Sequence, residues 1–227
     1  MVKVAIIAYN QQCKYYTISS VNAIQCVDIL IEKYDARIIY ILWGEIVSIH
    51  AQADKLLNYF GLLSVLKKYG NVYLVGSYQM DMMVWNDLDI YIEYEKSVIE
   101  KFYDLINDIN TTLKPFCFEG MQDISNKNIY YGFETYITGE RWNVDIWVKD
   151  KVEIANTQTY CSDIVNLVNN NPYYKNAITG IKQYLIAQGL YGFDKSPKKH
   201  YHSKDIYDAV LKEEILTVKE FIEKHSK

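Results

Sequence analysis

Two acidic residues that follow a short apolar segment constrain this chain more than any other feature. Residues 71–75 have the composition of a buried strand, which ends at Gly76 and Ser77. After nine further residues, Asp87 and Asp89 open a second segment in which apolar and polar residues alternate. Alternation is the pattern of a strand with one buried face. Because alternate side chains of a strand share a face, we expect the two carboxylates to point the same way.

The residue types in this segment indicate phosphate and metal chemistry. Two carboxylates on one face form the kind of oxygen site that suits Mg²⁺, which also takes phosphate oxygens of a substrate as ligands. Gly76 lets the backbone come close to a ligand, and Ser77 adds a hydroxyl and an N–H that can hold phosphate oxygens. The sequence therefore predicts a phosphate-binding turn beside a metal-binding pair.

This arrangement resembles the signature of the nucleotidyltransferase superfamily that includes DNA polymerase β. That signature is an apolar residue, Gly, Gly or Ser, about nine to thirteen residues, and then Asp-apolar-Asp/Glu-apolar. The superfamily also has a third carboxylate on a later strand, and Asp145 is the acidic residue of the apolar run from Val144 to Val148. The resemblance covers residues 51–148.

The resemblance implies an enzyme that transfers a nucleoside monophosphate from an NTP to an acceptor hydroxyl and releases pyrophosphate. Two Mg²⁺ ions are expected, with Mn²⁺ as a possible substitute. Asp87 and Asp89 would bind both ions, and Asp145 would complete the catalytic one. Gly76 and Ser77 would contact the nucleotide. The implied acceptor is a small molecule, a protein or an RNA.

The segment between Ser77 and Asp87 departs from the superfamily pattern because it contains no Arg, Lys or Gly. The charge of a triphosphate would then need cations from elsewhere. One source is the basic segment 195–204, from which Lys198, Lys199 and Lys204 are predicted nucleotide-binding residues. The alternative is a solvated basic loop, which is the more common meaning of a charge run.

The departure leaves a second functional class open. A catalytically weak or inactive module that binds a nucleotide or a protein partner, such as a toxin–antitoxin component, would tolerate a loop without a basic residue. Retention of Asp87, Asp89 and Asp145 opposes that interpretation, because a degenerate site would be expected to lose a carboxylate.

Composition limits the other classes. Half of the 227 residues are hydrophobic and 23% are charged, which is typical of a globular protein. The formal net charge of −4 argues against a broad nucleic-acid-binding face and slightly favours a small-molecule or protein acceptor. The four cysteines form no CxxC pair, and no run approaches the roughly 18 apolar residues of a membrane helix. We therefore expect a soluble, cytoplasmic protein without a membrane partner.

The expected fold is α/β (α+β), a nucleotidyltransferase-type mixed sheet flanked by helices. Residues 1–50 form an extension of uncertain structure, 51–149 the nucleotidyltransferase core and 150–227 a helical carboxy-terminal region. Strands are expected at 4–8, 37–42, 71–75, 88–94, 129–137 and 142–148, the last two joined by a hairpin turn. Helices are expected at 20–32, 51–69, 96–113, 162–168, 173–190, 203–211 and 217–224, the last with a capping box from Thr217 and Glu220.

Overall fold

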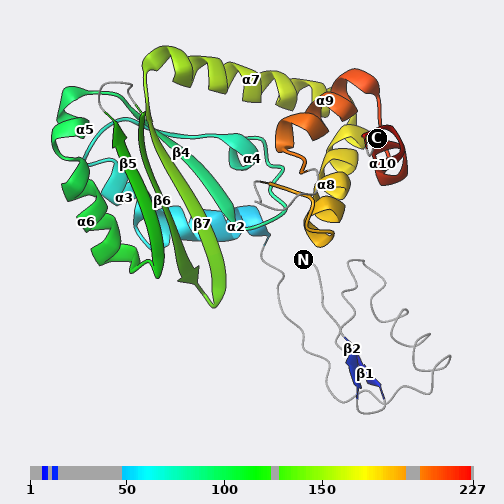
Figure 1. Cartoon of the computed structure of the whole chain (residues 1–227), viewed down its shortest axis with the longest axis horizontal. Helices are drawn as coiled ribbons and strands as arrows, with labels where there is room; N and C mark the ends of the chain where they lie inside the picture. The colour runs from blue at the N-terminus through cyan, green and yellow to red at the C-terminus, as the bar shows by residue number, and fades with distance from the viewer. Residues whose placement is uncertain (1–6, 10–11, 15–47, 124–127, 193–199, 226–227) are drawn as a thin grey trace. The chain divides into compact units, whose positions relative to one another are not determined.

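The computed structural model describes residues 7–9, 12–14, 48–123, 128–192 and 200–225 (Figure 1). The chain divides into two compact units, Met1–Ser48 and Ile49–Lys227. In the first unit, β1 (Ile7–Tyr9) pairs antiparallel with β2 (Gln12–Lys14). Of the strand expected at 4–8, only Ile7 and Ala8 are described, and both belong to β1. The expected helix 20–32 and strand 37–42 lie outside the described residues.

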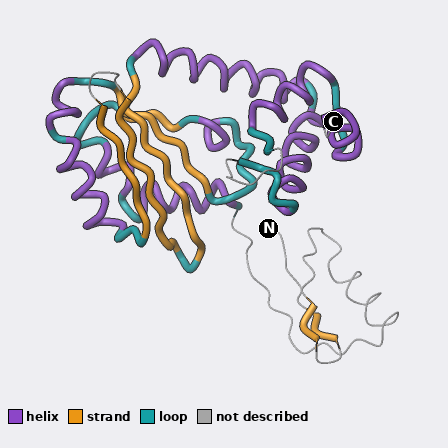
Figure 2. The backbone as a smooth tube through the Cα atoms, in the orientation of Figure 1, coloured by secondary structure: helices purple, strands orange, loops and turns teal. Residues whose placement is uncertain are grey.

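The second unit is built on a five-stranded mixed sheet with the order β3-β4-β7-β6-β5 (Figure 2). Its strands are β3 (Val72–Leu74), β4 (Asp87–Glu93), β5 (Cys117–Asp123), β6 (Asn128–Ile137) and β7 (Glu140–Lys149). The β4 and β7 strands are parallel, and the other neighbouring pairs are antiparallel. The predicted mixed sheet is confirmed.

Helices precede, interrupt and follow the sheet. They are α2 (Ile49–Asp54), the π-helix η1 (Lys55–Tyr59), α3 (Leu62–Leu66), α4 (Gly76–Gln79), α5 (Lys96–Glu100), α6 (Phe102–Leu113), α7 (Lys151–Asn170), α8 (Pro172–Ala187), α9 (Ser203–Glu213) and α10 (Val218–His225). Among the described residues, no helix has both the length and the apolar character needed to cross a bilayer.

One face of the sheet is the core of the second unit. Leu88 and Ile90 of β4 are fully buried, as are Val144 and Ile146 of β7. They pack in one cluster with apolar side chains of α2, η1, α3, α5 and α6. Because side chains alternate along a strand, the residues between these positions face the other side of the sheet. The burial of Leu88 and Ile90 agrees with the strand with one buried face that the alternation predicts.

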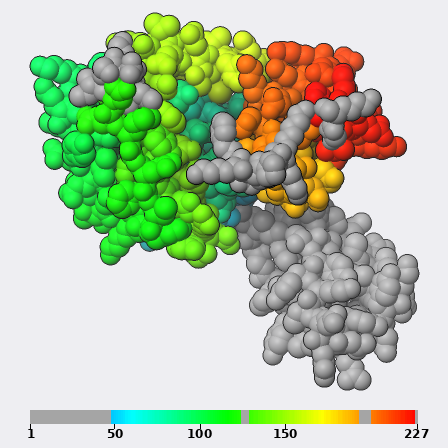
Figure 3. Space-filling view, in the orientation of Figure 1, coloured from blue at the N-terminus to red at the C-terminus, as the bar shows by residue number. Residues whose placement is uncertain are grey.

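The carboxy-terminal helices form a second apolar cluster. It contains residues of α7, α8, α9 and α10 together with Met80 and Met82, which precede β4. In Figure 3 the atoms of α8, α9 and α10, coloured yellow to red, pack together. The predicted helical carboxy-terminal region is therefore present, and the two methionines join it to the segment that leads into the sheet.

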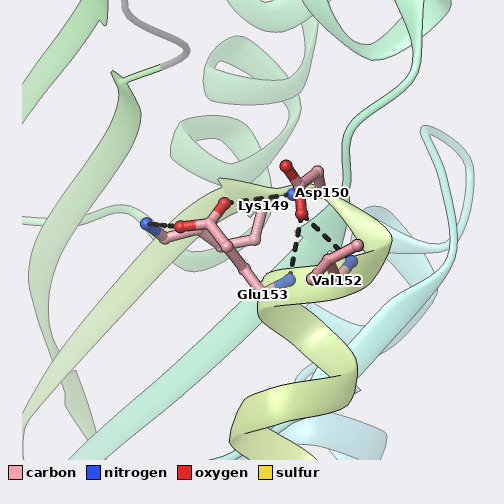
Figure 4. Close-up of polar contacts among 4 residues, drawn as sticks. All are labelled: Lys149, Asp150, Val152 and Glu153. Atoms are coloured by element: carbon pink, nitrogen blue, oxygen red, sulfur yellow. Dashed lines mark hydrogen bonds and ion pairs between the residues drawn. The ribbon is translucent and has the colours of Figure 1, made fainter.

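The α7 helix begins eleven residues before the start predicted at residue 162, because a capping box fixes its first turn at Lys151. The Asp150 carboxylate accepts hydrogen bonds from the N–H groups of Val152 (3.0 Å) and Glu153 (2.9 Å). Glu153 in turn accepts from the Asp150 N–H at 3.3 Å, and its other oxygen pairs with Lys149 (Figure 4). Such reciprocal bonds satisfy N–H groups that a helix start otherwise leaves unpaired.

The single helix predicted over 51–69 is wrong. The π-helix η1 continues directly from α2, and Gly61 then adopts a left-handed conformation (φ 84°) that separates η1 from α3. A left-handed residue ends the i to i−4 hydrogen-bonding pattern, and glycine adopts it without steric cost.

The β5 strand was not predicted. Its residues 117–121 are all exposed, because β5 is an edge strand of the sheet. An exposed edge strand carries no regular alternation of apolar residues, which is the signal used to predict strands. The hairpin between β6 and β7 is confirmed, with Thr138 and Gly139 both at positive φ. The capping box of Thr217 and Glu220 is confirmed as well.

Candidate functional site

The three predicted carboxylates lie on adjacent parallel strands. Asp89 of β4 is in register with Asp145 of β7, and Asp87 is in register with Asn143. All four residues lie on the sheet face opposite the core because their neighbours along each strand are buried. The structure therefore brings together three carboxylates that are up to 58 residues apart in the sequence.

Hydrogen-bond donors from the sheet hold these carboxylates. Asn143 Nδ2 donates to Asp87 Oδ1 at 2.7 Å and to Asp145 Oδ2 at 3.3 Å. Tyr130 of β6 donates from its hydroxyl to Asp145 Oδ1 at 2.7 Å. The amide thus bridges Asp87 and Asp145, and the phenol from the neighbouring strand gives Asp145 a second donor. Sequence analysis missed both donors, because their role depends on strand register.

Gly76 lies directly against the site. Its φ is 65°, and a Cβ atom added there would be 2.5 Å from Asp89 Oδ2. A side chain at this position would displace the carboxylate or the turn. The turn at Gly76 therefore packs against Asp89, and the predicted approach of its backbone to a nucleotide stays a prediction.

Burial and mutual repulsion make Asp87 and Asp89 reluctant to ionise. Removal from water raises the pKa of both carboxyl groups, and the neighbouring negative charges raise it further. Asn143 opposes the shift at Asp87 through its hydrogen bond, and the Lys182 ammonium opposes it at both residues. Like charges held this close are relieved by a cation, which is the electrostatic character of a metal-binding pair.

Lys182 of α8 is a further charged residue of the site and was not predicted. Its side chain is 1% exposed, and its Nζ donates to the Met82 carbonyl oxygen at 3.2 Å. The ammonium lies 5.9 Å from the ring centroid of Tyr191 and 5.7 Å from that of Tyr207. Burial lowers the pKa of Lys182 to about 8, against the opposing effect of Asp87 and Asp89.

A sequence pattern could have identified Lys182 as a candidate functional residue. It occupies the apolar stripe of α8 with Ile178, Ile181 and Leu185, spaced as one face of a helix. A lysine on a buried helical stripe needs a partner or a function, because an isolated buried charge is costly.

Two hollows meet at the carboxylates. The first has a volume of about 460 Å³ and is lined by Val75, Gly76, Ser77, Met80, Asp87, Asp89, Tyr91, Thr157, Tyr160, Cys161, Tyr191, Ser203, Lys204 and Tyr207. The second has a volume of about 600 Å³ and is lined by Trp85, Asp87, Asp89, Glu119, Tyr130, Asn143, Asp145, Tyr191, Gly192, His202, Ser203 and Lys204. Asp87 and Asp89 line both hollows, Gly76 and Ser77 only the first, and Asp145 only the second.

Of the three lysines predicted to bind nucleotide, Lys204 is within the described residues. Lys204 lines both hollows from the first turn of α9. Lys198 and Lys199 lie outside the described residues, so their predicted contact with nucleotide stays a prediction. Arg141, on the same strand as Asp145, pairs at the surface with Glu134 at 2.5 Å.

The donor set fits a divalent cation in part. Among the described residues, no three His, Cys, Asp or Glu side chains are grouped closely enough to form a metal site alone. Asp87 and Asp89 supply two carboxylates on one face. Mg²⁺ is ordinarily held by one or two carboxylates and completed by water and substrate phosphates. The pair therefore suits a metal that arrives with a nucleotide.

Comparison with solved structures identifies the fold. The chain aligns with the Cid1 poly(U) polymerase in a MgGTP-bound structure at a TM-score of 0.52 and 15% identity, covering 72% of this chain and 49% of that one. It aligns with a cytoplasmic RNA terminal U-transferase at a TM-score of 0.52 and 16% identity, covering 73% and 48%. This chain has the nucleotidyltransferase fold. The predicted resemblance to that superfamily is confirmed at the level of the fold.

Comparisons based on sequence did not detect the nucleotidyltransferase fold. No family model matches the chain, and no curated protein matches it. The chain spans about half the length of the solved structures it matches. Another structure of Cid1, described for its RNA terminal uridylyl transferase activity, gives a TM-score of 0.54 with 15% identity, 73% coverage of this chain and 49% of that one.

Proposed function

We propose that this protein transfers a nucleoside monophosphate from an NTP to an acceptor hydroxyl. The acceptor oxygen forms a bond to the α-phosphorus, the bond from that phosphorus to the β-phosphate oxygen breaks, and pyrophosphate leaves. The hydroxyl proton passes to solvent. The observation that carries the proposal is the division of the site into two hollows that share Asp87 and Asp89.

The first hollow suits the triphosphate. It contains Gly76 and Ser77, whose backbone and hydroxyl can approach phosphate oxygens. Lys204 lies at its rim and the buried Lys182 ammonium lies near the carboxylates. These two lysines come from α8 and α9, so they supply the positive charge that the segment 78–86 lacks.

The second hollow suits the acceptor. Asp145 lines it, and the Tyr130 and Asn143 donors fix that carboxylate. A hydroxyl bound there would donate to Asp145 while it faces a nucleotide in the first hollow. In-line displacement needs this opposed placement of attacking and leaving oxygens.

Asp87 and Asp89 are the residues that would hold both Mg²⁺ ions, with Asp145 completing the site of the catalytic ion. Bound Mg²⁺ would supply Lewis-acid stabilisation of the attacking and leaving oxygens. The raised pKa values of Asp87 and Asp89 support this assignment, because a nearby cation favours the ionised form of both carboxylates. Magnesium nucleotides are bound in solved structures of Cid1, at 15–16% identity.

The acceptor class is the open part of the proposal. The second hollow contains an exposed indole, Trp85, which is 40% exposed, and four carboxylates from Asp87, Asp89, Glu119 and Asp145. The structural neighbours are named for RNA-terminal transfer. An RNA 3′ hydroxyl and a cationic small molecule are therefore the first acceptors to test, followed by a protein hydroxyl.

Nucleotide binding is tested by thermal unfolding with Mg²⁺ and each NTP in turn. A ligand present at 100 times its dissociation constant adds about 2.7 kcal/mol to the free energy of unfolding. We expect this stabilisation in the wild-type protein and its loss in Asp87→Asn and Asp89→Asn. The matched control is Asp108→Asn, an aspartate on α6 that pairs with Lys68 away from the site.

Transfer is tested with α-labelled NTP and a panel of a short RNA, an aminoglycoside and a cell lysate. We expect label on one acceptor class and none with Asp145→Asn. Nucleotide-dependent stabilisation without transfer to any acceptor would favour the inactive binding module, such as a toxin–antitoxin component. Absence of stabilisation by every NTP at millimolar concentration would overturn the enzymatic proposal.

A further inference from the structure

The Asp145 carboxylate is held by a residue that sequence patterns do not connect with catalysis. Tyr130 lies on β6, and its hydroxyl is 2.7 Å from Asp145 Oδ1 and 3.4 Å from Glu119 Oε1. A phenol has one proton to donate, and the shorter distance assigns it to Asp145. Hydrogen bonds from neutral donors to a carboxylate are among the stronger ones in proteins.

The ring of Tyr130 is fixed as well as its hydroxyl. It packs on the indole of Trp147 with ring centroids 4.4 Å apart, and Trp147 is its register partner on β7. The ring extends along β6 toward Gly132, whose register partner is Asp145. The phenol therefore reaches across the position of Gly132 to the carboxylate.

Gly132 leaves the space that this contact needs. A Cβ atom at Gly132 would lie 1.9 Å from the Tyr130 hydroxyl oxygen, 2.6 Å from its Cζ and 3.0 Å from Asp145 Oδ1. Any other residue at this position would force the phenol away from Asp145. Residue 132 lies in the middle of a ten-residue strand, where glycine is otherwise unfavourable. The lack of a side chain at this position therefore provides the room for the hydrogen bond between Tyr130 and Asp145.

We propose that Tyr130 is a positioning residue that aims Asp145 into the acceptor hollow, and that Gly132 is required for its placement. The phenol occupies one lone pair of Oδ1 and Asn143 one of Oδ2, so the remaining lone pairs are presented in a fixed orientation. This inference rests on the proposed function for its effect on transfer, but the contact itself exists without nucleotide.

The contact is tested first in the absence of any activity. Urea unfolding of wild type, Tyr130→Phe, Asp145→Ala and the double variant gives a double-mutant cycle, because alanine removes the acceptor oxygen that asparagine would keep. We expect the unfolding constants to show a coupling of roughly tenfold between the two positions. Tyr136→Phe is the matched control, since Tyr136 lies on the same strand but is 62% exposed and stacks on Phe116. Coupling within twofold of unity would overturn the proposed hydrogen bond.

The effect on transfer is tested next. Tyr130→Phe is expected to lower kcat by roughly tenfold to a hundredfold, with KM for the NTP within about twofold of wild type. Gly132→Ala is expected to lower kcat at least as much, and the double variant Tyr130→Phe/Gly132→Ala no further than Gly132→Ala alone. Gly120→Ala on β5 is the control, because its Cβ would meet only ordinary contacts at 3.5 Å or more.

The outcomes separate the two proposals. A raised KM with unchanged kcat, or full activity in Tyr130→Phe beside an inactive Asp145→Asn, would overturn the positioning role. A wild-type protein without transfer activity, but with coupling between Tyr130 and Asp145, would count against the proposed function and leave the contact in place.

Discussion

The Lys182 ammonium donates a hydrogen bond to the carbonyl oxygen of Met82, 100 residues earlier in the chain. This contact connects α8 to the segment between Ser77 and Asp87, which contains no Lys or Arg. The side chain is buried, and the negative charges of Asp87 and Asp89 act on it. Lys182 of α8 thus supplies a cation that residues 78–86 do not contain.

Lys182→Met is expected to weaken nucleotide binding without unfolding the protein. The substitution removes the charge that offsets Asp87 and Asp89 and the donor to the Met82 carbonyl oxygen, so some loss of stability is expected as well. It also removes the nearest buried cation to the carboxylates. We expect the rise in melting temperature that NTP causes to be smaller in this variant, measured in each case from the melting temperature of the same protein without NTP.

The control for this change is Lys175→Met on the same helix. Lys175 pairs at the surface with Asp81, and such exposed pairs contribute little to stability. Equal loss of nucleotide response in both variants would contradict a specific role for Lys182.

Gly76→Ala is expected to abolish the nucleotide response. The new Cβ would overlap the Asp89 carboxylate, and the positive φ at this position strains any residue other than glycine. Gly180→Ala is the matched control because it lies within α8 with no atom within 4 Å of the added Cβ. That control is expected to raise the free energy of unfolding by about 0.5–1 kcal/mol through helix propensity. Nucleotide-dependent stabilisation retained in Gly76→Ala would show that the site tolerates a side chain.

Metal-free protein is expected to lose stability as the pH rises from about 4 to about 7. The pKa of Asp87 is raised to about 7 in the folded protein, so the folded state binds more protons than the unfolded chain within this window. The stabilisation is complete below the ordinary carboxyl pKa and is lost as the pH passes the raised value. Urea unfolding with a chelator measures the change, for which the shift at Asp87 sets an upper value of about 4 kcal/mol.

The double variant Asp87→Asn/Asp89→Asn should flatten this pH dependence, because an amide does not titrate in the window. Addition of Mg²⁺ with NTP should oppose the loss in the wild type. An unchanged pH profile in the double variant would mean that other groups cause the dependence.

Lys204→Met is expected to reduce NTP affinity by a smaller factor than Lys182→Met. Lys204 lines both hollows but is exposed, and solvent screens its charge. Isothermal titration with a non-hydrolysable NTP and Mg²⁺ gives the two affinities. Lys212→Met is the control, since Lys212 lies on the same helix and pairs with Asp208. A larger effect at Lys204 than at Lys182 would reverse the proposed order.

Much of the fold could be predicted because periodicity is local. Alternation along residues 88–94 and 142–148 gives strands with a buried face, and apolar spacing gives the helices after residue 150. The helix predicted over 51–69 failed because Gly61 was read as one more helical position, although it turns left-handed. The edge strand β5 has an exposed sequence without a period, so no local signal marks it.

Some residues of the candidate site could likewise be predicted from the sequence, and others could not. The sequence alone determined which face carries Asp87 and Asp89, because alternation on a strand fixes orientation, and its order and spacing placed Asp145 on a later strand. Only the tertiary structure decided that Lys182, Tyr130 and Asn143 reach these carboxylates. Their contacts depend on strand register and helix packing between residues far apart in the chain, and no local pattern encodes those distances.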